Sequence, residues 1–366
     1  MKNNKNDVSK AENFETSKIK FFKKQSASDW MDEAKSLPEL KKIFGELWYQ
    51  GEISFLYADT NTGKSILAVQ IAEMVTKGLS FGPLENEIEP LKLLYFDFEL
   101  TVKQFEHRYI DGDKRHNFSD LFDRVEFDPH MELEDDQTLE QAVTNEIEKL
   151  VVEGGYKYLI IDNYTYLASE MEKGKNSIPL MRSLKEIKNQ HGLSILILGH
   201  TKKRDNKVKI SSDDLSGSKA LMNFCDSAFA IGKSEKDPNL RYIKQMKVRN
   251  SALLYGDDNV LLCAIEKQDG FLGFRFIEFS TEKENLKENG GPTKEMMQQA
   301  IEMYKENIPY REIAEKLGKS KSTVCNWIKK YKLQKEEDSV QSVHLQSRVT
   351  ELDKNQNEEK KNELPF

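Results

Sequence analysis

The sequence has few cysteines, no long apolar run and no excess of positive charge, and each shortage argues against a class of protein. Cys225, Cys263 and Cys325 are its only cysteines. They are odd in number, lie far apart and match no metal-binding spacing. This pattern predicts buried or incidental thiols in a reducing cytosol.

Signals for membrane insertion and export are also missing. No apolar run approaches the roughly 20 residues that a membrane span needs, and the Lys- and Asn-rich N-terminus has no apolar signal core. We therefore expect a cytoplasmic protein with no membrane partner. Charged residues make up 32% of the 366 residues and the formal net charge is −7. This balance argues against a globally basic nucleic-acid coat protein and is compatible with a local basic patch.

The most informative segment lies between an apolar run, 53–57, and a helix-like run that begins at Ile66. It fits the P-loop pattern G-x-x-x-x-G-K-[ST] with alanine at the first glycine position: Ala58, Asp59, Thr60, Asn61, Thr62, Gly63, Lys64 and Ser65. Backbone N–H groups of such a loop bind phosphates, Lys64 adds a cation for them, and the Ser65 hydroxyl can ligate Mg²⁺. The segment predicts a site for ATP and Mg²⁺. The alternative is a chance GKS in a glycine-containing turn.

The apolar pattern predicts an α/β core. Strands are expected at 53–57, 92–98, 124–128, 156–162 and 194–200, with helices at 64–77, 101–112, 138–152 and 178–190. Continuous apolar strands separated by helices indicate a mostly parallel sheet with helices on both faces. After residue 225, four strand-like runs without helices between them predict hairpins or a meander at the sheet edge.

Composition divides the chain into five parts. We expect a flexible arm at 1–28, an ATPase domain at 29–280, a linker at 281–292, a helical domain at 293–334 and a disordered polar tail at 335–366. The linker ends in Gly-Gly-Pro, which breaks regular structure.

Two acidic residues end predicted strands and are candidates for the chemistry. Asp162 ends the run YLIID, where the Walker B aspartate of a P-loop protein faces Mg²⁺; the alternative is a turn or N-cap residue. Glu99 follows the strand 92–98, where one class of P-loop ATPases carries the general base that polarises the attacking water. Asp97 points to the same face and is a second candidate. The alternative for Glu99 is a first-turn acid of the helix near Thr101.

His200 ends the strand 194–200, where a polar residue can sense the γ-phosphate and pass its state to the next loop. Residues 201–216 are polar and lack a strand or helix period, and long structureless loops in compact domains are usually functional. Five cations in eight residues would neutralise phosphates of single-stranded DNA: Lys202, Lys203, Arg204, Lys207 and Lys209. The alternative is an ordinary solvated surface loop.

Lys247 and Arg249 lie two residues apart on a late predicted strand and therefore share one face. At a subunit boundary, both would reach the γ-phosphate bound by the neighbouring subunit. Otherwise they are solvated charges that protect a sheet edge from aggregation.

The order of these motifs resembles that of RecA-fold hexameric helicases. Over roughly residues 40–280 the chain is similar to the plasmid RepA-type and DnaB-type replicative helicase superfamily, and the spacing of Glu99, Gln104 and Arg108 resembles its E-x4-Q-x3-R pattern. The resemblance implies a RecA-like P-loop core that forms a homo-oligomeric ring, a hexamer. It also implies Glu99 as catalytic base, His200 as sensor, and Lys247 with Arg249 as trans fingers. Without a helical collar before the core, the compact RepA-like layout fits better than the DnaB-like one.

Residues 293–334 predict a small all-α helix–turn–helix unit. Apolar positions recur at helical spacing, Gly318 ends one helix, and Ser320 or Ser322 can cap the next. Residues 290–334 carry nine Lys or Arg against five Asp or Glu, a net +4 in an acidic protein. The unit resembles the helix–turn–helix domains of resolvases and transposases, and its candidate contacts to duplex DNA are Ser322, Thr323, Asn326, Lys329 and Lys330. The alternative is a helical protein-interaction module.

Taken together, these patterns predict an ATPase coupled to DNA. The first interpretation is a ring-shaped replicative helicase of a plasmid, phage or integrated mobile element. The second is an ATPase switch that regulates replication, recombination or transcription without unwinding. The third is a DNA-binding regulator whose P-loop binds nucleotide without hydrolysing it.

Overall fold

The computed structural model describes residues 22–126, 133, 137–164, 178–202, 205, 207–215, 218–286, 294–319, 321–329 and 331. The chain divides into two compact units, Met1–Lys287 and Glu288–Phe366. Most of the predicted arm, the later part of the predicted linker and the predicted tail lie outside the described residues. Helix α1 (Ala27–Lys35) begins within the last two residues predicted as arm and buries none of its side chains.

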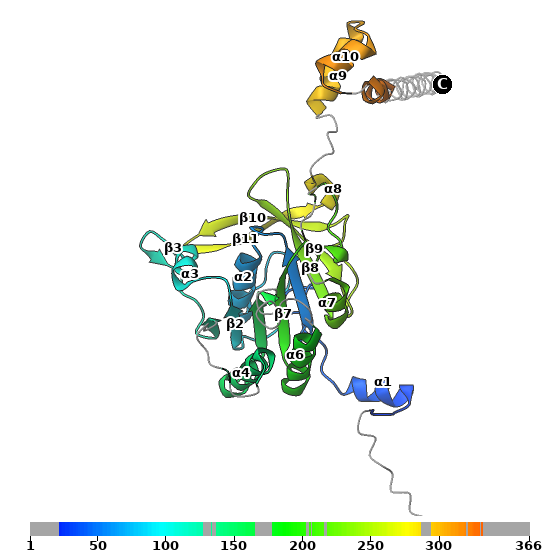
Figure 1. Cartoon of the computed structure of the whole chain (residues 1–366). Coiled ribbons are helices and arrows are strands. Elements are labelled where there is room, and N and C mark those ends of the chain that lie inside the picture. Colours follow the sequence, from blue (N-terminus) through cyan, green and yellow to red (C-terminus); the bar gives the residue numbers. More distant parts are fainter. Residues whose placement is uncertain are drawn as a thin grey trace, which may run out of the picture. The chain divides into compact units, whose positions relative to one another are not determined.

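A nine-stranded sheet forms the first unit, in the order β11-β10-β9-β8-β1-β7-β6-β2-β5 (Figure 1). Its parallel strands are β1 (Ile53–Ala58), β2 (Leu93–Asp97), β5 (Phe122–Glu126), β6 (Tyr158–Asp162), β7 (Ser194–His200) and β8 (Ser227–Lys233). An antiparallel meander extends the sheet through β9 (Leu240–Lys247), β10 (Val260–Gln268) and β11 (Phe271–Ser280). The predicted mostly parallel α/β fold and the change to a meander are confirmed.

Hydrophobic cores lie on both faces of this sheet. One contains α2 (Lys64–Lys77), and the other contains α4 (Leu139–Gly154), α6 (Ile178–His191) and α7 (Ser218–Phe224). Successive strand residues enter opposite cores: in β6, Ile160 belongs to the core of α2, and Ile161 belongs to the other. Since both faces are covered, the central strands are apolar throughout, which is why they read as continuous runs in the sequence.

Local capping residues set the bounds of the helices. Thr101 and Gln104 form a capping box at the start of α3 (Val102–Arg108), and Thr138 and Gln141 form one at the start of α4. Helix α3 is shorter than the predicted 101–112, because the chain turns after Arg108 into a small hairpin of β3 (Ile110–Asp111) and β4 (Lys114–Arg115).

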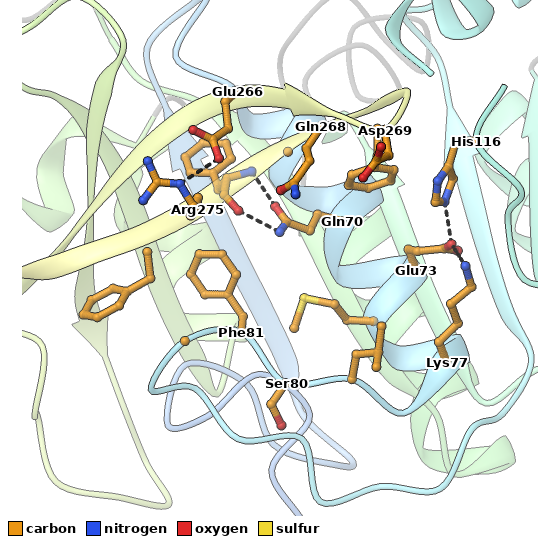
Figure 2. Close-up of a pocket in the computed structure, with 17 residues that line it drawn as sticks. Gln70, Glu73, Lys77, Ser80, Phe81, His116, Glu266, Gln268, Asp269 and Arg275 are labelled. Carbon is orange, nitrogen blue, oxygen red and sulfur yellow. Dashed lines mark hydrogen bonds and ion pairs between the residues drawn. The ribbon is translucent and has the colours of Figure 1, made fainter. Parts of the chain in front are cut away.

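The antiparallel meander is fastened to α2. The Gln70 amide donates from Nε2 to the carbonyl oxygen of Phe274 at 2.9 Å, and its Oε1 accepts the Phe274 N–H at 2.7 Å (Figure 2). A side-chain amide that satisfies both backbone groups of one strand residue fixes the distance between helix and strand. The position of β11 is therefore fixed relative to α2, the helix that follows the P-loop.

A buried ion pair joins β9 to α8 (Glu282–Asn285), the short helix after β11. The Lys244 ammonium lies 2.5 Å from Glu282 Oε2 and 2.6 Å from Asp257 Oδ1, and it donates to the Ile210 carbonyl oxygen at 2.8 Å. The Glu282 side chain is fully buried, and its Oε1 accepts the Ile210 N–H at 2.7 Å and the Tyr242 hydroxyl at 3.1 Å. This network fixes one part of the 201–215 loop against the core.

The second unit contains α9 (Lys294–Lys305), α10 (Tyr310–Lys316) and a helix over residues 321–329. Its own core consists of Ala300, Ile313, Ala314, Val324, Trp327 and Ile328. Gly318 has φ of 61°, the left-handed conformation that ends helices, so its predicted place at the turn is confirmed. The three helices form the small helical region that the spacing predicts.

Replacing Lys244 by Met should destabilise the first unit by about 3–5 kcal/mol, because it leaves the Glu282 carboxylate buried without a cation. Denaturant unfolding followed by tryptophan fluorescence measures the change. Lys209→Met is the matched control, since Lys209 pairs with the same Asp257 and is half exposed, and it should leave the midpoint nearly unchanged. Equal midpoints for both variants would contradict the role given to the buried pair.

Candidate nucleotide site

The P-loop connects β1 to α2, and its conformation requires glycine at position 63. Gly63 has φ of 105°, in the left-handed region that side chains disfavour. A Cβ atom there would also lie 2.8 Å from Ile265 Cδ1 and 2.9 Å from Phe274 Cζ. The meander therefore packs directly on the loop, and residues far along the chain support its shape.

Lys64 is buried, and its ammonium is held at the carboxyl ends of β1 and β7. Its Nζ donates to the carbonyl oxygens of Ala58 at 3.1 Å and Asp59 at 3.3 Å, and it lies 3.1 Å from Nδ1 of His200. Burial lowers the pKa of Lys64, and the nearby Asp162 and Glu99 carboxylates oppose this shift. None of these partners is a direct ion pair, so a phosphate would be a stronger partner for the ammonium.

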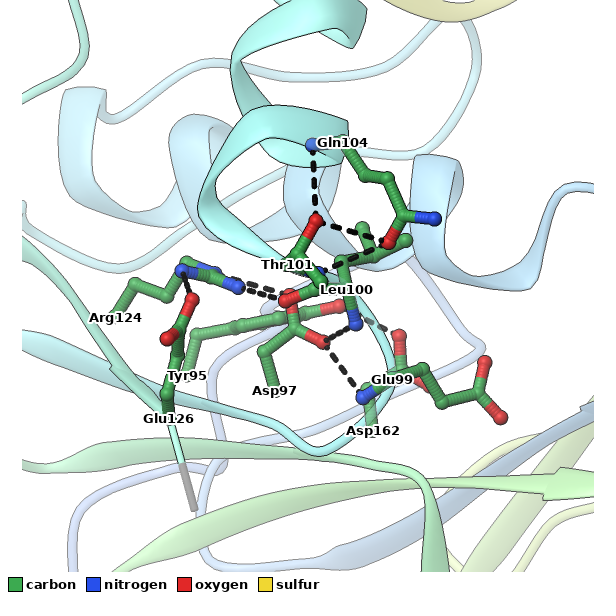
Figure 3. Close-up of polar contacts among 9 residues, drawn as sticks. All are labelled: Tyr95, Asp97, Glu99, Leu100, Thr101, Gln104, Arg124, Glu126 and Asp162. Carbon is green, nitrogen blue, oxygen red and sulfur yellow. Dashed lines mark hydrogen bonds and ion pairs between the residues drawn. The ribbon is translucent and has the colours of Figure 1, made fainter. Parts of the chain in front are cut away.

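Asp162 is fully buried at the end of β6. Its Oδ2 accepts the Tyr95 hydroxyl at 2.6 Å (Figure 3). Burial raises the pKa of Asp162 to about 6, and the Ser65 and Tyr95 hydroxyls partly oppose the shift. The other oxygen, Oδ1, is buried and has no hydrogen-bond partner of normal geometry in the part of the chain that the structure describes. A buried carboxylate oxygen that makes no hydrogen bond of normal geometry with a described residue fits a metal ligand.

The residues present fit a Mg²⁺ ion that arrives with a nucleotide. Among the described residues, no three His, Cys, Asp or Glu side chains gather closely enough to hold a metal by themselves. Mg²⁺ commonly binds through one or two protein ligands, substrate phosphates and water. Ser65 and Asp162 would be the two protein ligands. The ion would neutralise charge on the phosphates.

Glu99, His200 and Asn163 form a polar chain that ends at Lys64. The Lys64 ammonium is only a donor, so His200 Nδ1 is placed to accept from it, and Nε2 lies 3.0 Å from the Asn163 side-chain amide. This Nε2 lies 3.3 Å from Glu99 Oε1, which also accepts from the Asn163 side-chain amide. The hydrogen bond from His200 lowers the pKa of Glu99, although partial burial opposes it. The Glu99 carboxylate is therefore ionised and able to accept a proton.

The Asp97 carboxylate stabilises the turn after β2. Its Oδ1 accepts the N–H groups of Glu99 at 3.1 Å and Leu100 at 2.9 Å, and its Oδ2 accepts from Arg124 Nε at 2.9 Å (Figure 3). The Glu99 side chain extends away from this cluster. The geometry thus favours Glu99 over Asp97 as the base, and it gives Asp97 the task of positioning Glu99.

The site also contains residues that the sequence patterns did not assign a role. A cavity of about 370 Å³ is lined by the P-loop, Glu99 and His200 and also by Arg108, Asn239, Arg241 and Ile265. Arg241 donates from Nε to the Thr62 carbonyl oxygen at 3.0 Å. Arg108 Nη1 is buried and has no hydrogen-bond partner among the described residues. The E-x4-Q-x3-R spacing marked Arg108, whereas no local pattern marks Arg241, Asn239 or Asn163.

Lys247 and Arg249 lie at the end of the sheet opposite the P-loop. Strand β9 ends at Lys247, so Arg249 lies beyond the strand, and the prediction that both residues share one strand face is wrong. Because β9 runs antiparallel to β8, Lys247 is paired with Ala228 near the amino end of β8, far from the P-loop end. The Lys247 ammonium donates to the carbonyl oxygens of Met222 at 2.5 Å and Cys225 at 2.8 Å, and Arg249 pairs with Asp226 at 2.9 Å. Neither side chain lines the nucleotide cavity of its own chain. Their role as trans fingers remains a prediction.

The described part of the basic loop lies directly after the site. Its base is closed by a bridge between Thr201 and Leu215, and Lys202 N–H donates to the Asp214 carbonyl oxygen at 2.7 Å. The Lys202 and Lys207 side chains are exposed, and Lys209 pairs with Asp257. Lys203 and Arg204 lie outside the described residues.

The predicted DNA contacts of the second unit share the outer face of the helix 321–329. Ser322, Asn326 and Lys329 are exposed and Thr323 is half-buried, whereas Val324, Trp327 and Ile328 are in the core. Lys330 lies outside the described residues. The outer face is thus the one that the spacing predicts, and DNA contact by these side chains remains a prediction.

A second cavity, of about 570 Å³, lies between α2, the turn at 79–82 and the β10–β11 hairpin (Figure 2). It shares no lining residue with the nucleotide cavity. Its main charged groups are already paired: Glu73 with Lys77 and His116, and Arg275 with Glu266. It therefore offers no unpaired charge that would select a ligand.

This fold and the groups gathered around Lys64 define a RecA-like P-loop ATPase. The family comparison agrees, since residues 17–206 match the AAA domain. The match spans more than half of the chain, which belongs to this family. Residues 298–339 match a homeodomain-like domain, a helix–turn–helix fold. No curated protein matches the chain. Within the described residues, no helix combines the length and apolar character that crossing a membrane demands.

Glu99→Gln should lower ATP turnover by roughly 10²–10⁴-fold, the usual contribution of a general base, and should leave nucleotide binding nearly intact. Steady-state hydrolysis and nucleotide titration measure the two effects. Asp97→Asn is the comparison, and because it weakens the contacts to Arg124 and the turn, it should lower thermal stability as well as activity. Normal hydrolysis by Glu99→Gln, with lost hydrolysis by a stably folded Asp97→Asn, would move the base to Asp97.

Proposed function

We propose that this DNA-associated ATPase forms a ring and unwinds DNA, as the replicative helicase of a plasmid, phage or integrated mobile element. The AAA domain and the homeodomain-like domain support the coarser function, an ATPase that acts on DNA. The observation that best supports ATP hydrolysis is the series of side-chain contacts from Lys64 through His200 to Glu99. A protein that only bound nucleotide would have no need of an ionised carboxylate beside the P-loop lysine.

Each group at the site has a proposed task. Lys64 binds the β- and γ-phosphates, Ser65 and Asp162 hold Mg²⁺, and Glu99 takes the proton of the attacking water. Arg108 supplies a second cation from the same chain, because it lines the cavity and its Nη1 has no hydrogen-bond partner among the described residues. When a phosphate takes the Lys64 ammonium, His200 Nδ1 loses its present donor. His200 directly precedes the basic loop, so the change in its hydrogen bonds would be passed to the segment that is proposed to bind DNA.

The ring is supported by the position of the two predicted fingers. Lys247 and Arg249 lie near the amino ends of the parallel strands, whereas the P-loop lies at their carboxyl ends. They therefore cannot serve the site of their own chain. Arg249 is about half exposed, with its side chain 48% accessible, so a neighbouring copy can reach it. Such an arginine acts as a trans finger in other nucleotide hydrolases.

One observation favours the alternative of a switch that does not unwind. The second unit is a helix–turn–helix, a fold that reads duplex DNA, whereas unwinding requires a grip on one strand. Strand displacement on a forked duplex, with ATP and Mg²⁺, separates the two functions. Hydrolysis stimulated by DNA without displaced strand would support the switch and remove the helicase.

Arg249→Ala should abolish DNA-stimulated ATP hydrolysis in an assembly of identical chains. Mixing it with Lys64→Ala chains should restore part of the activity, because the intact Arg249 of a Lys64→Ala neighbour would serve the intact P-loop of an Arg249→Ala chain. Hydrolysis is measured across mixing ratios, and mass photometry with ATP and DNA reports the assembly. A monomer that hydrolyses ATP fully with DNA, or an Arg249→Ala protein of normal activity, would remove the ring model.

Lys329→Ala in the full chain should weaken binding to all duplex sequences alike and lower the salt dependence by about one phosphate contact. Asn326→Ala should instead change the preference among sequences, because amide side chains read base edges. Fluorescence anisotropy with duplexes at several salt concentrations measures both. Lys316→Ala is the control, since Lys316 pairs with Glu312 on α10. Binding by both variants equal to the control would favour the protein-interaction module.

A further inference from the structure

The 201–215 loop is held by the core at two places. Its base is closed by the Thr201–Leu215 bridge next to His200. Farther along, the two backbone polar groups of Ile210 bind the buried Glu282 and Lys244 side chains at 2.7 and 2.8 Å. The position of Lys209, one residue before Ile210, is therefore fixed by the core, even though its side chain is half exposed.

Two lysines share the carboxylate of Asp257. Lys209 Nζ lies 2.7 Å from Oδ2, and Lys244 Nζ lies 2.6 Å from Oδ1. Two ammonium groups on two oxygens of one anion are also the arrangement that holds a phosphate. The Asp257 side chain is 42% exposed, so an anion from solution can approach the same place.

Asp257 can leave this place without stranding a buried charge. The Lys244 ammonium keeps Glu282 at 2.5 Å and the Ile210 carbonyl oxygen at 2.8 Å. Lys244 would lose one of its three contacts, and Lys209 would lose its one ion pair among the described residues. Hydrogen bonds from the two lysines lower the pKa of Asp257 to about 2, so the carboxylate is charged at any pH at which the protein would meet DNA.

We propose that Asp257 is an internal competitor for DNA: its carboxylate occupies Lys209 in the free protein, and a backbone phosphate of single-stranded DNA replaces it on binding. The inference rests on the proposed function of the 201–215 loop as the contact to single-stranded DNA. Because Lys209 exchanges one anion for another, binding gains less from this lysine than from an unpaired one. Asp257 thus weakens the grip of the loop on any polyanion.

Asp257→Asn should strengthen binding of single-stranded DNA by about two- to fivefold at low salt, the range expected for one exposed ion pair. Anisotropy of labelled oligo-dT, titrated with the full chain, measures it. Asp258→Asn is the matched control, because it changes the net charge equally at the next residue, whose carboxylate influences Lys209 only at longer range, without the direct contact that Asp257 makes. It should bind nearly as the parent does.

The double variant Lys209→Ala/Asp257→Asn should bind as Lys209→Ala does, since the competitor acts only through Lys209. If Asp257→Asn lowers the melting temperature, Asp257→Ser repeats the test without the amide. Equal binding by Asp257→Asn and Asp258→Asn, or a gain that persists without Lys209, would overturn the inference and leave the proposed function standing. No binding of oligo-dT by the parent at low salt would overturn both the loop contact and the competitor.

Discussion

The candidate nucleotide site is built around one buried ammonium group, that of Lys64, at the carboxyl ends of the parallel strands. Lys64 is held by two backbone carbonyl oxygens and by Nδ1 of His200. The other ring nitrogen of His200 lies 3.3 Å from Glu99, so one imidazole connects the lysine to the carboxylate. Strand order is what makes this possible, because β1, β7, β6 and β2 are consecutive neighbours whose carboxyl ends carry the P-loop, His200, Asp162 and Glu99.

Much of this arrangement could be predicted from the sequence. The central strands are buried on both faces, so their apolar runs are unbroken, and Gly63-Lys64-Ser65 has a strand before it and a helix after it. Parallel strands bring their carboxyl ends to one edge, and polar residues at those ends were therefore expected to meet. Lys64, Asp162, Glu99 and His200 do lie together. The outer face of the helix 321–329 followed equally well from helical spacing, because three buried positions fix the orientation of the rest.

What could not be predicted depends on where strands end and on contacts between distant residues. The sequence placed Lys247 and Arg249 on one face of a strand, whereas β9 ends at Lys247 and Arg249 follows it. The pairing of β9 with β8 puts Arg241 beside the P-loop and Lys247 at the opposite end of the sheet, and no local pattern marked Arg241. Asp97 and Glu99 are two residues apart, and their tasks are separated by contacts of the folded chain: Asp97 accepts two N–H groups of the turn and pairs with Arg124 on the neighbouring strand. Likewise, the partner of Lys209 is 48 residues away.

The folded first unit is longer than the segment that matches the AAA domain. The AAA match ends at residue 206, yet β8 is the neighbour of β1 in the sheet and follows that point in the chain. A chain ending there would leave one side of β1 with unpaired amides and carbonyls, an open edge that recruits other strands. It would also lose Ile265 and Phe274, which back the loop at Gly63. The nucleotide site therefore depends on β8 and the meander as much as on the matched segment, and a truncation designed at residue 206 would remove part of its support.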